Sequence, residues 1–209
     1  MLTFAGETFE LDDQETTFYG WIDPYGKDRK PGVTWDLLIQ GQAKEIDVHQ
    51  ILPRGFKRTF DFPILERKPT LDFSEMEIPA CDWRNIEGVS TADCSSFSFY
   101  FIDDFAHVAM DACSLSFLKR EGPIFTVEFS GQGGMEACGI DFSFHGLLEV
   151  ALRGIGMYFQ PGEKDPVRAG RQLLKQHLPA SSFTAYELEN FPRNAPSNIA
   201  RQKLVFTIE

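Results

Sequence analysis

Apolar and polar residues alternate along much of this chain. Every second residue is apolar in four segments: 33–39, 97–101, 125–129 and 204–208. Since successive side chains of a strand point to opposite faces, this period of two predicts strands with one face against a core. The same reasoning places further strands at 2–11, 16–23, 44–52, 59–65, 70–78, 138–147, 148–160 and 183–190.

Turn-forming residues separate these segments. Gly, Pro and Asp occur at 24–26, 30–32, 103–104, 121–123 and 131–134. Short connections of this kind join antiparallel neighbours, whereas parallel strands need long crossovers. We therefore expect a meander of about five strands over 95–160, and a final hairpin that pairs 183–190 with 202–208.

One segment carries the signals of a helix. Asp165 can cap its N-terminus, and Pro166 suits the first helical position. Leu178 precedes Pro179, which disfavours continuation of the helix. Residues that can form a buried stripe recur at helical spacing: Val167, Gly170, Leu174 and Leu178. The sequence predicts one helix at about 165–178, packed on one side of the strands.

Residues 105–118 change their apolar face partway along a predicted strand. The even positions are apolar up to Ala112, and the odd positions are apolar from Cys113 onward. A strand cannot change face without an extra residue or a bend, so we expect a β-bulge or twist near Ala112–Ser114. The predicted core includes the alternating residues Phe97, Phe99, Phe101, Phe125, Val127, Phe129, Phe142 and Phe144.

Composition favours the same fold class. Phe occurs 20 times and Leu 17 times among 209 residues, and aromatic side chains fit the pleated surface of a sheet. A chain of this length can bury about 70% of its unfolded surface. We therefore predict a mainly β single domain over 1–209. It is an antiparallel β-sandwich or a barrel-like meander with one α-helix at about 165–178.

An ancient internal duplication is an open alternative. At an offset of 80 residues, about 17–75 aligns with about 97–155. Only 5 of 59 positions over 17–75 are then identical, which is little above chance. Recurring aromatic residues in a Phe-rich sheet explain the resemblance as well as a duplication does.

The chain is acidic, with 20 Lys and Arg against 31 Asp and Glu, a formal net charge of −11 and a pI near 4.8. Because phosphates must be met by Lys and Arg, this charge argues against a broad nucleic-acid interface. The mean hydropathy of −0.22 indicates no membrane span. The first residues lack a basic segment followed by an apolar run, so we expect a cytoplasmic protein.

No motif identifies a cofactor or a catalytic centre. Gly-x-Ser-x-Gly and His-Glu-x-x-His are absent, and Gly131–Gly134 lacks the Gly-Lys-Ser/Thr ending of a phosphate loop. None of Cys81, Cys94, Cys113 and Cys138 has the Cys-x-x-Cys spacing of a zinc or redox site. We expect four free thiols, no catalytic residue and no cofactor.

Two His-x-x-x-acid pairs are the candidate metal ligands. His107 precedes Asp111 by four residues, and His145 precedes Glu149 by four. This spacing places both members of a pair on one face of a strand, so two neighbouring strands could present four ligands to a metal. Gly146 could instead end the strand between His145 and Glu149. The alternative is histidines at strand ends that hydrogen-bond to nearby carboxylates.

Positive charge is concentrated near the predicted helix. Residues 153–209 have a net charge of +3, whereas residues 1–152 have −14. Four basic residues at spacings of 4, 3 and 4 form a basic stripe: Lys164, Arg168, Arg171 and Lys175. We expect these residues to pair with acidic strands. The alternative is a docking face for an acidic partner or an anion.

Three classes of function follow from these observations. The favoured class is a non-enzymatic interaction protein, such as an acidic inhibitor or immunity-like protein that binds a basic partner. The first alternative is a small-ligand binder with an aromatic-lined cavity, which depends on a hollow between the Phe-rich faces. The second is a metal-dependent enzyme that uses His107, Asp111, His145 and Glu149. The sequence points to no particular oligomeric state.

Overall fold

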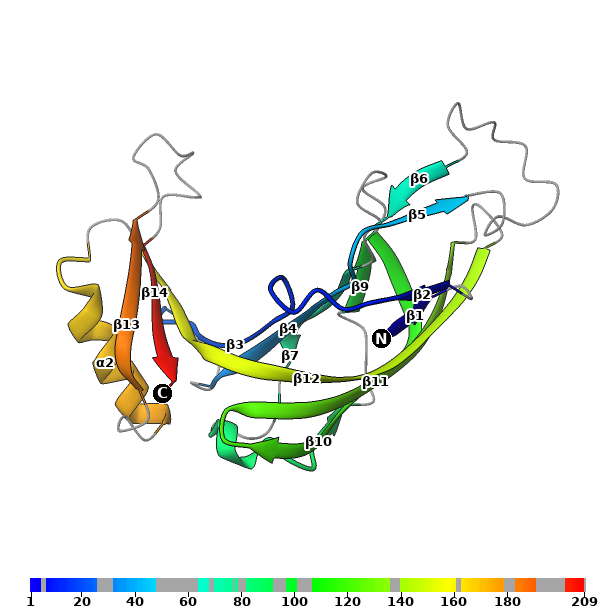
Figure 1. The fold of residues 1–209 in the computed structure, drawn as a ribbon. Coiled ribbons are helices and arrows are strands. Elements are labelled where there is room, and N and C mark those ends of the chain that lie inside the picture. Colours follow the sequence, from blue (N-terminus) through cyan, green and yellow to red (C-terminus); the bar gives the residue numbers. More distant parts are fainter. Residues whose placement is uncertain are drawn as a thin grey trace.

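The computed structural model describes residues 1–4, 7–25, 32–47, 64–67, 70–76, 78, 82–91, 97–100, 107–135, 140–160, 163–178, 183–190 and 202–208. Strands dominate, one α-helix accompanies them, and a curled mixed sheet forms a half-barrel (Figure 1). The mainly β class with one helix is therefore confirmed. The strands are β1 Leu2–Phe4, β2 Glu7–Phe9, β3 Thr17–Ile22, β4 Thr34–Gln40, β5 Lys44–Asp47, β6 Ile64–Arg67, β7 Thr70–Met76, β8 Ser90–Thr91, β9 Phe97–Tyr100, β10 His107–Glu121, β11 Ile124–Met135, β12 Ile140–Phe159, β13 Phe183–Asn190 and β14 Gln202–Ile208.

The main sheet has the strand order β11-β10-β9-β7-β4-β3-β12-β1-β2, and β5 pairs with β6 in a separate ribbon. β12 also pairs with β11 and β14, so its two halves belong to different parts of the sheet. One pairing departs from the antiparallel expectation, because β12 runs parallel to β3. Strands β4 to β11 lie between these two in the sequence, which provides the long connection that a parallel pair needs. The predicted hairpin of 183–190 with 202–208 is confirmed as β13 and β14.

β12 corrects the expected strand boundaries. The two strands predicted at 138–147 and 148–160 form one continuous strand over Ile140–Phe159, so the described residues of this region hold four strands, β9 to β12, where about five were expected. Gly146 does not end the strand, because it pairs with Phe129 of β11 on one side and Leu2 of β1 on the other. A Cβ atom at Gly146 would lie 2.3 Å from the Phe129 ring, so this glycine makes room for an aromatic neighbour. Segment 2–11 is also two paired strands, β1 and β2, rather than one.

Irregular pairing interrupts both long strands. In β10 the register shifts between Met110 and Ala112, next to the predicted bulge at Ala112–Ser114. In β12 the pairing with β3 shifts between Leu152 and Gly154. The buried apolar side chains of β12 occupy even-numbered positions up to Leu152 and odd-numbered positions from Ile155 to Phe159, with the buried glycines Gly154 and Gly156 at the change. These bulges turn each strand from one part of the curled sheet into another.

The core lies between two layers of the half-barrel. Phe18 of β3 contacts Phe117 of β10 and Phe125 of β11, with ring centroids 5.4 and 5.5 Å apart. Of the predicted core residues, Phe125, Val127, Phe129 and Phe144 are confirmed as buried. The remaining four predictions concern Phe101 and the side chains of Phe97, Phe99 and Phe142, which lie outside the described structure.

The helix, α2, covers Pro166–His177 and matches the prediction. The Asp165 carboxylate accepts a hydrogen bond from the Arg168 backbone N–H, and the Leu178 N–H donates to the Leu174 carbonyl. Gly170 is buried where the helix meets Leu204 and Phe206 of β14. The helix thus covers the face of β14 that carries these two side chains, at the left end of the molecule in Figure 1.

Candidate functional site

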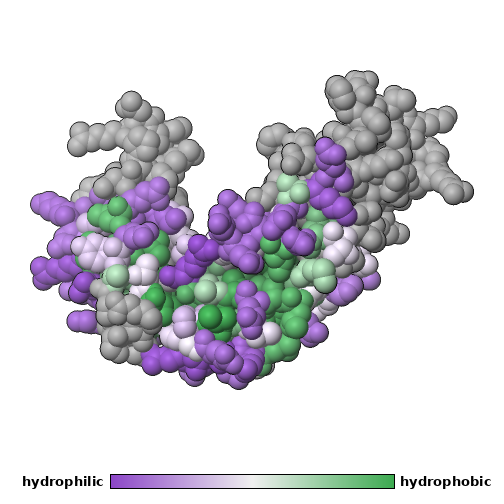
Figure 2. Space-filling model, in the orientation of Figure 1, coloured by the Kyte–Doolittle hydropathy of each residue, from purple (hydrophilic) through white to green (hydrophobic). Residues whose placement is uncertain are grey.

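The curled sheet has a concave face opposite the core. Phe18 points towards β10 and β11, which lie beneath β12 in Figure 1. Tyr19 and Trp21 therefore point to the opposite, open side of the sheet. This side lies between two arms, one formed by α2, β13 and β14 and the other carrying β5 and β6. Direct strand pairing extends this surface across six strands. We define the concave face by Tyr19, Trp21, Thr34, Asp36, Asp72, Tyr158, Glu187, Glu189 and Lys203. Figure 2 shows the hollow between the arms, with hydrophilic residues along its floor.

A stacked aromatic pair lies on the concave face. The rings of Trp21 and Tyr158 are 5.0 Å apart at their centroids and 8° from parallel. The ring centroid of Tyr19 lies 6.0 Å from that of Trp21 on the same face. Gly156 makes this arrangement possible, because a Cβ there would lie 2.2 Å from the Trp21 ring. Tyr158 remains 37% exposed, so the pair is open to solvent on one side.

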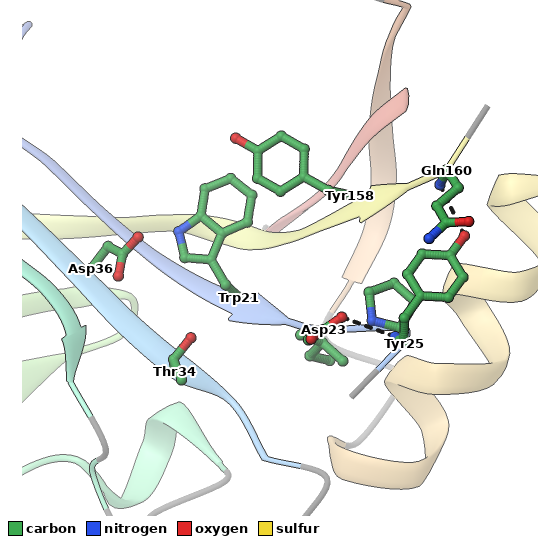
Figure 3. A pocket seen from close by; sticks show the side chains of 9 residues that line it. Trp21, Asp23, Tyr25, Thr34, Asp36, Tyr158 and Gln160 are labelled. Atoms are coloured by element: carbon green, nitrogen blue, oxygen red, sulfur yellow. Dashed lines mark hydrogen bonds between the residues drawn. The ribbon is translucent and has the colours of Figure 1, made fainter. Parts of the chain in front are cut away.

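A pocket of about 530 Å³ opens beside this pair (Figure 3). Thr34 and Asp36 of β4 stand on one side of Trp21, and Tyr25 and Gln160 stand on the other. The Tyr25 backbone N–H donates a 2.9 Å hydrogen bond to Asp23 Oδ1, and the Gln160 backbone N–H donates a 2.9 Å bond to Tyr25 Oη. These bonds fix the wall of the pocket that follows β3.

Negative charge surrounds the aromatic pair. Four carboxylates lie on the concave face and a fifth borders the pocket: Asp36, Asp72, Glu187, Glu189 and Asp23. Lys203 is the base within this face, with its Nζ atom 5.9 Å from the centre of the Trp21 ring and 4.0 Å from Glu189. Arg153, at the β12 bulge, donates to the carbonyls of residues 13, 14 and 16 and holds the turn before β3. Four of the nine residues that define this face are therefore acidic and one is basic.

The two predicted His-acid pairs do not lie on neighbouring strands. β11 separates β10, which carries His107 and Asp111, from β12, which carries His145 and Glu149. His145 and Glu149 are both exposed on β12, and the side chains of His107 and Asp111 are outside the described structure. Among the described residues, no group of three or more His, Cys, Asp or Glu side chains could hold a metal ion.

His145 borders a second open pocket, of about 570 Å³, on the outer face of β10 to β12. Ser114 and Ser130 share a 2.7 Å hydrogen bond there through their Oγ atoms, and both line the pocket. The described contacts contain no hydrogen bond between His145 and either serine. The Ser114–Ser130 bond instead joins the paired strands β10 and β11.

The basic stripe is exposed, but it is not paired as expected. Lys164 precedes α2, and Arg168, Arg171 and Lys175 lie along it. Within the described part of the chain, none of the four makes an ion pair. Arg171 instead lies 5.9 Å from the ring centre of Tyr186. The reason is geometric, because α2 packs on one face of β13 and β14, whereas the acidic residues of β13 point to the other.

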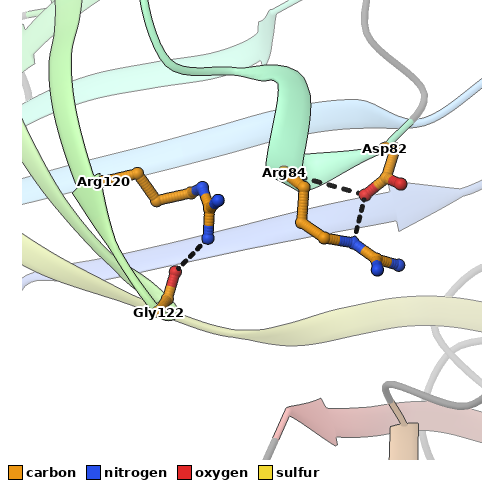
Figure 4. Close-up of polar contacts among 4 residues, drawn as sticks. All are labelled: Asp82, Arg84, Arg120 and Gly122. Atoms are coloured by element: carbon orange, nitrogen blue, oxygen red, sulfur yellow. Dashed lines mark hydrogen bonds and ion pairs between the residues drawn. The ribbon is translucent and has the colours of Figure 1, made fainter.

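A tryptophan on the opposite layer has two arginine neighbours of its own. The guanidinium groups of Arg84 and Arg120 lie 5.7 and 5.3 Å from the ring centre of Trp83. Arg84 pairs with Asp82 at 3.1 Å, and Arg120 donates to the Gly122 carbonyl at 3.0 Å (Figure 4). Both guanidinium groups therefore have partners within the chain, whereas Arg120 Nε and Trp83 Nε1 are buried without a hydrogen-bond partner in the part of the chain that the structure describes. Cys113 is buried, and the other three cysteines lie outside the described residues.

No protein-family model, curated protein or solved structure matches this chain. In the described part of the structure, no helix combines the length and apolar character needed to cross a membrane.

The concave face was not recognised from sequence. The available signal was local, because Tyr19 and Trp21 place large aromatic rings on the face of β3 that the alternation assigns to solvent.

Proposed function

We propose that this protein is a non-enzymatic interaction protein whose concave face binds a basic protein partner. One observation carries the proposal: an aromatic pair that is open to solvent lies among five carboxylates on a hollowed surface. Trp and Tyr are the residue types that most often anchor protein interfaces. Surrounding carboxylates favour a partner of opposite charge and exclude an acidic one.

The charge of the whole chain supports the same partner class. A net charge of −11 attracts a basic protein over distances comparable with the Debye length, about 8 Å at physiological ionic strength. This attraction accelerates encounter, and contacts with the aromatic pair then slow dissociation. A protein that neutralises a basic toxin or nuclease would need both properties.

The alternatives receive less support from the geometry. An aromatic-lined cavity requires a hollow between the Phe-rich faces, but Phe18, Phe117 and Phe125 are in mutual contact. The ring centroid of Trp35 also lies 5.6 Å from that of Phe18, and Trp35 is completely buried. A metal enzyme requires the two His-acid pairs on neighbouring strands, and β11 separates them.

An affinity experiment with matched charge variants tests the proposal. The tagged protein is used to capture partners from a lysate of its native host, at low and at raised salt concentration. The test variant is Asp23→Asn with Glu187→Gln and Glu189→Gln, and the control is Glu87→Gln with Glu128→Gln and Glu149→Gln. All six carboxylates are exposed, so neither set opens the core.

We expect the wild type and the control to capture the same basic protein. The test variant should lose it, and raised salt should release it. Capture of no basic protein, or equal capture by the test and control variants, would contradict the proposal.

A further inference from the structure

The pocket beside Trp21 has the features of a receptor for a planar cation. Its floor includes the stacked rings of Trp21 and Tyr158, and its walls carry Asp23 and Asp36. Flat aromatic faces attract a cation through the ring quadrupole, and carboxylates accept its hydrogen bonds. Both kinds of group therefore face one volume of about 530 Å³.

Oxygen acceptors predominate among the polar groups of this pocket. Besides the two carboxylates, the lining residues Thr34 and Tyr25 contribute hydroxyl oxygens, and Gln160 contributes an amide oxygen. Asp23 Oδ1 accepts one bond from the Tyr25 N–H, which orients this carboxylate. The Trp21 indole N–H, which has no hydrogen-bond partner among the described residues, is a donor in the same lining. A cationic ligand with several donors matches the two carboxylates better than a neutral ligand does.

The chain itself shows that these rings accept cations. Lys203 Nζ already lies 5.9 Å from the centre of the Trp21 ring. Elsewhere in the chain, each of the aromatic rings Trp83 and Tyr186 has a guanidinium group within 6 Å of its centre. Tyr158 offers a ring that is 37% exposed in the same stack.

We infer that this pocket receives an arginine side chain of the basic partner, with the guanidinium against the Trp21–Tyr158 pair and its N–H groups directed to a carboxylate of the pocket lining. This inference rests on the proposed function, since it names the group by which that partner is recognised. Arginine fits better than lysine because its guanidinium is planar, stacks on rings and presents five donors in a fixed geometry. Lysine provides a compact, strongly hydrated charge that stacks poorly.

The tryptophans provide a direct readout in the full chain. Trp35 is completely buried and Trp83 is 6% exposed, whereas Trp21 is half-buried beside the pocket. The indole N–H resonance of Trp21 can be assigned in an NMR spectrum by its absence in Trp21→Phe. The wild type is then titrated with capped peptides of three arginines, three lysines or three citrullines. Citrulline has nearly the shape of arginine but no charge.

The arginine peptide should shift the Trp21 resonance in a saturable manner and leave those of Trp35 and Trp83 in place. We expect the lysine peptide to bind at least about threefold more weakly, and the citrulline peptide to give no saturable shift. Tyr158→Ala should weaken arginine binding by about threefold or more, Tyr158→Phe should retain it, and Glu128→Gln should match the wild type. Equal binding of arginine and lysine, or arginine binding that Tyr158→Ala leaves unchanged, would overturn the inference.

The two proposals can fail separately. If the captured partner depends on the concave carboxylates but not on Tyr158, and the arginine peptide does not bind, the partner surface stands and the arginine pocket is wrong. If the arginine peptide binds as expected but no basic protein is captured, the pocket stands and the proposed function is wrong.

Discussion

Replacement of Gly156 by Ala should dislodge the Trp21 ring from the concave face. The added Cβ would lie 2.2, 2.5 and 2.8 Å from three atoms of that ring, whereas ordinary contact begins near 3.4 Å. The ring would have to withdraw by about 1.2 Å. Gly156 is not among the glycines with positive φ, so alanine meets no backbone strain at this position. The whole effect should therefore come from contact with Trp21.

The expected magnitude combines two opposing effects. Overpacking typically costs about 1–3 kcal/mol, and the loss of an aromatic stack costs about 0.5–1.5 kcal/mol. Alanine in place of glycine recovers about 0.4–1 kcal/mol because the unfolded chain has fewer conformations. Since Trp21 is half-buried and its ring can turn towards solvent, we expect a net loss of about 1–2 kcal/mol in the free energy of unfolding.

A double-mutant cycle separates this contact from other effects. Urea unfolding, followed by far-ultraviolet circular dichroism, is measured for the wild type, Gly156→Ala, Trp21→Ala and the double variant. In the Trp21→Ala background the new methyl group has room, so Gly156→Ala should be neutral or stabilising. We expect a coupling free energy of at least about 1 kcal/mol between the two positions. An equal cost of Gly156→Ala in both backgrounds would refute the reasoning.

The remaining predictions concern the core, an exposed ion pair and the basic stripe. Phe129→Ala should lower the free energy of unfolding by about 3–5 kcal/mol, because this completely buried ring would leave a cavity; a loss under about 1 kcal/mol in urea unfolding would contradict this. The hydrogen-bonded Lys119 ammonium lowers the pKa of Glu121, and the Glu121 carboxylate raises the pKa of Lys119. The pair's stabilising effect should thus fade as pH falls through the lowered pKa of Glu121 or rises through the raised pKa of Lys119. Because both groups are fully exposed, thermal melts of Glu121→Gln should differ little from the wild type at neutral pH. Arg168→Glu with Arg171→Glu should change the stability by less than about 1 kcal/mol in thermal melts, because neither residue makes an ion pair within the described structure, and a larger loss would show that the stripe supports the fold.

Local patterns in the sequence predicted the elements whose contacts are local. The helix at Pro166–His177 was predictable because its cap, its first proline and its apolar spacing lie within one short segment. The hairpin of β13 and β14 was predictable from two alternating runs close together in the chain. The buried face of β11 followed from alternation alone, since Phe125, Val127 and Phe129 share one side of a regular strand.

Pairings between distant segments were not predictable in the same way. β3 and β12 are far apart in sequence, and no local signal shows that they run parallel. Gly146 was considered a possible strand end because glycine weakens strands in general. Its actual role depends on the Phe129 ring on a neighbouring strand, which a single segment does not reveal. The pocket beside Trp21 depends on that same parallel pairing and was missed for the same reason.

Glycine–aromatic pairs occur both in the core and on the concave face, but their energetic consequences differ. In the core, the rings of Phe129 and Phe144 lie over Gly146 and Gly131, and burial of those rings offsets the conformational entropy that each glycine loses on folding. On the concave face, Gly156 has the same entropic cost, yet the aromatic pair it accommodates remains partly in water. The stability of the isolated chain therefore gains less from this third pair. A partner that covers the concave face would complete the burial, and the binding free energy would then include the contribution that folding alone does not recover.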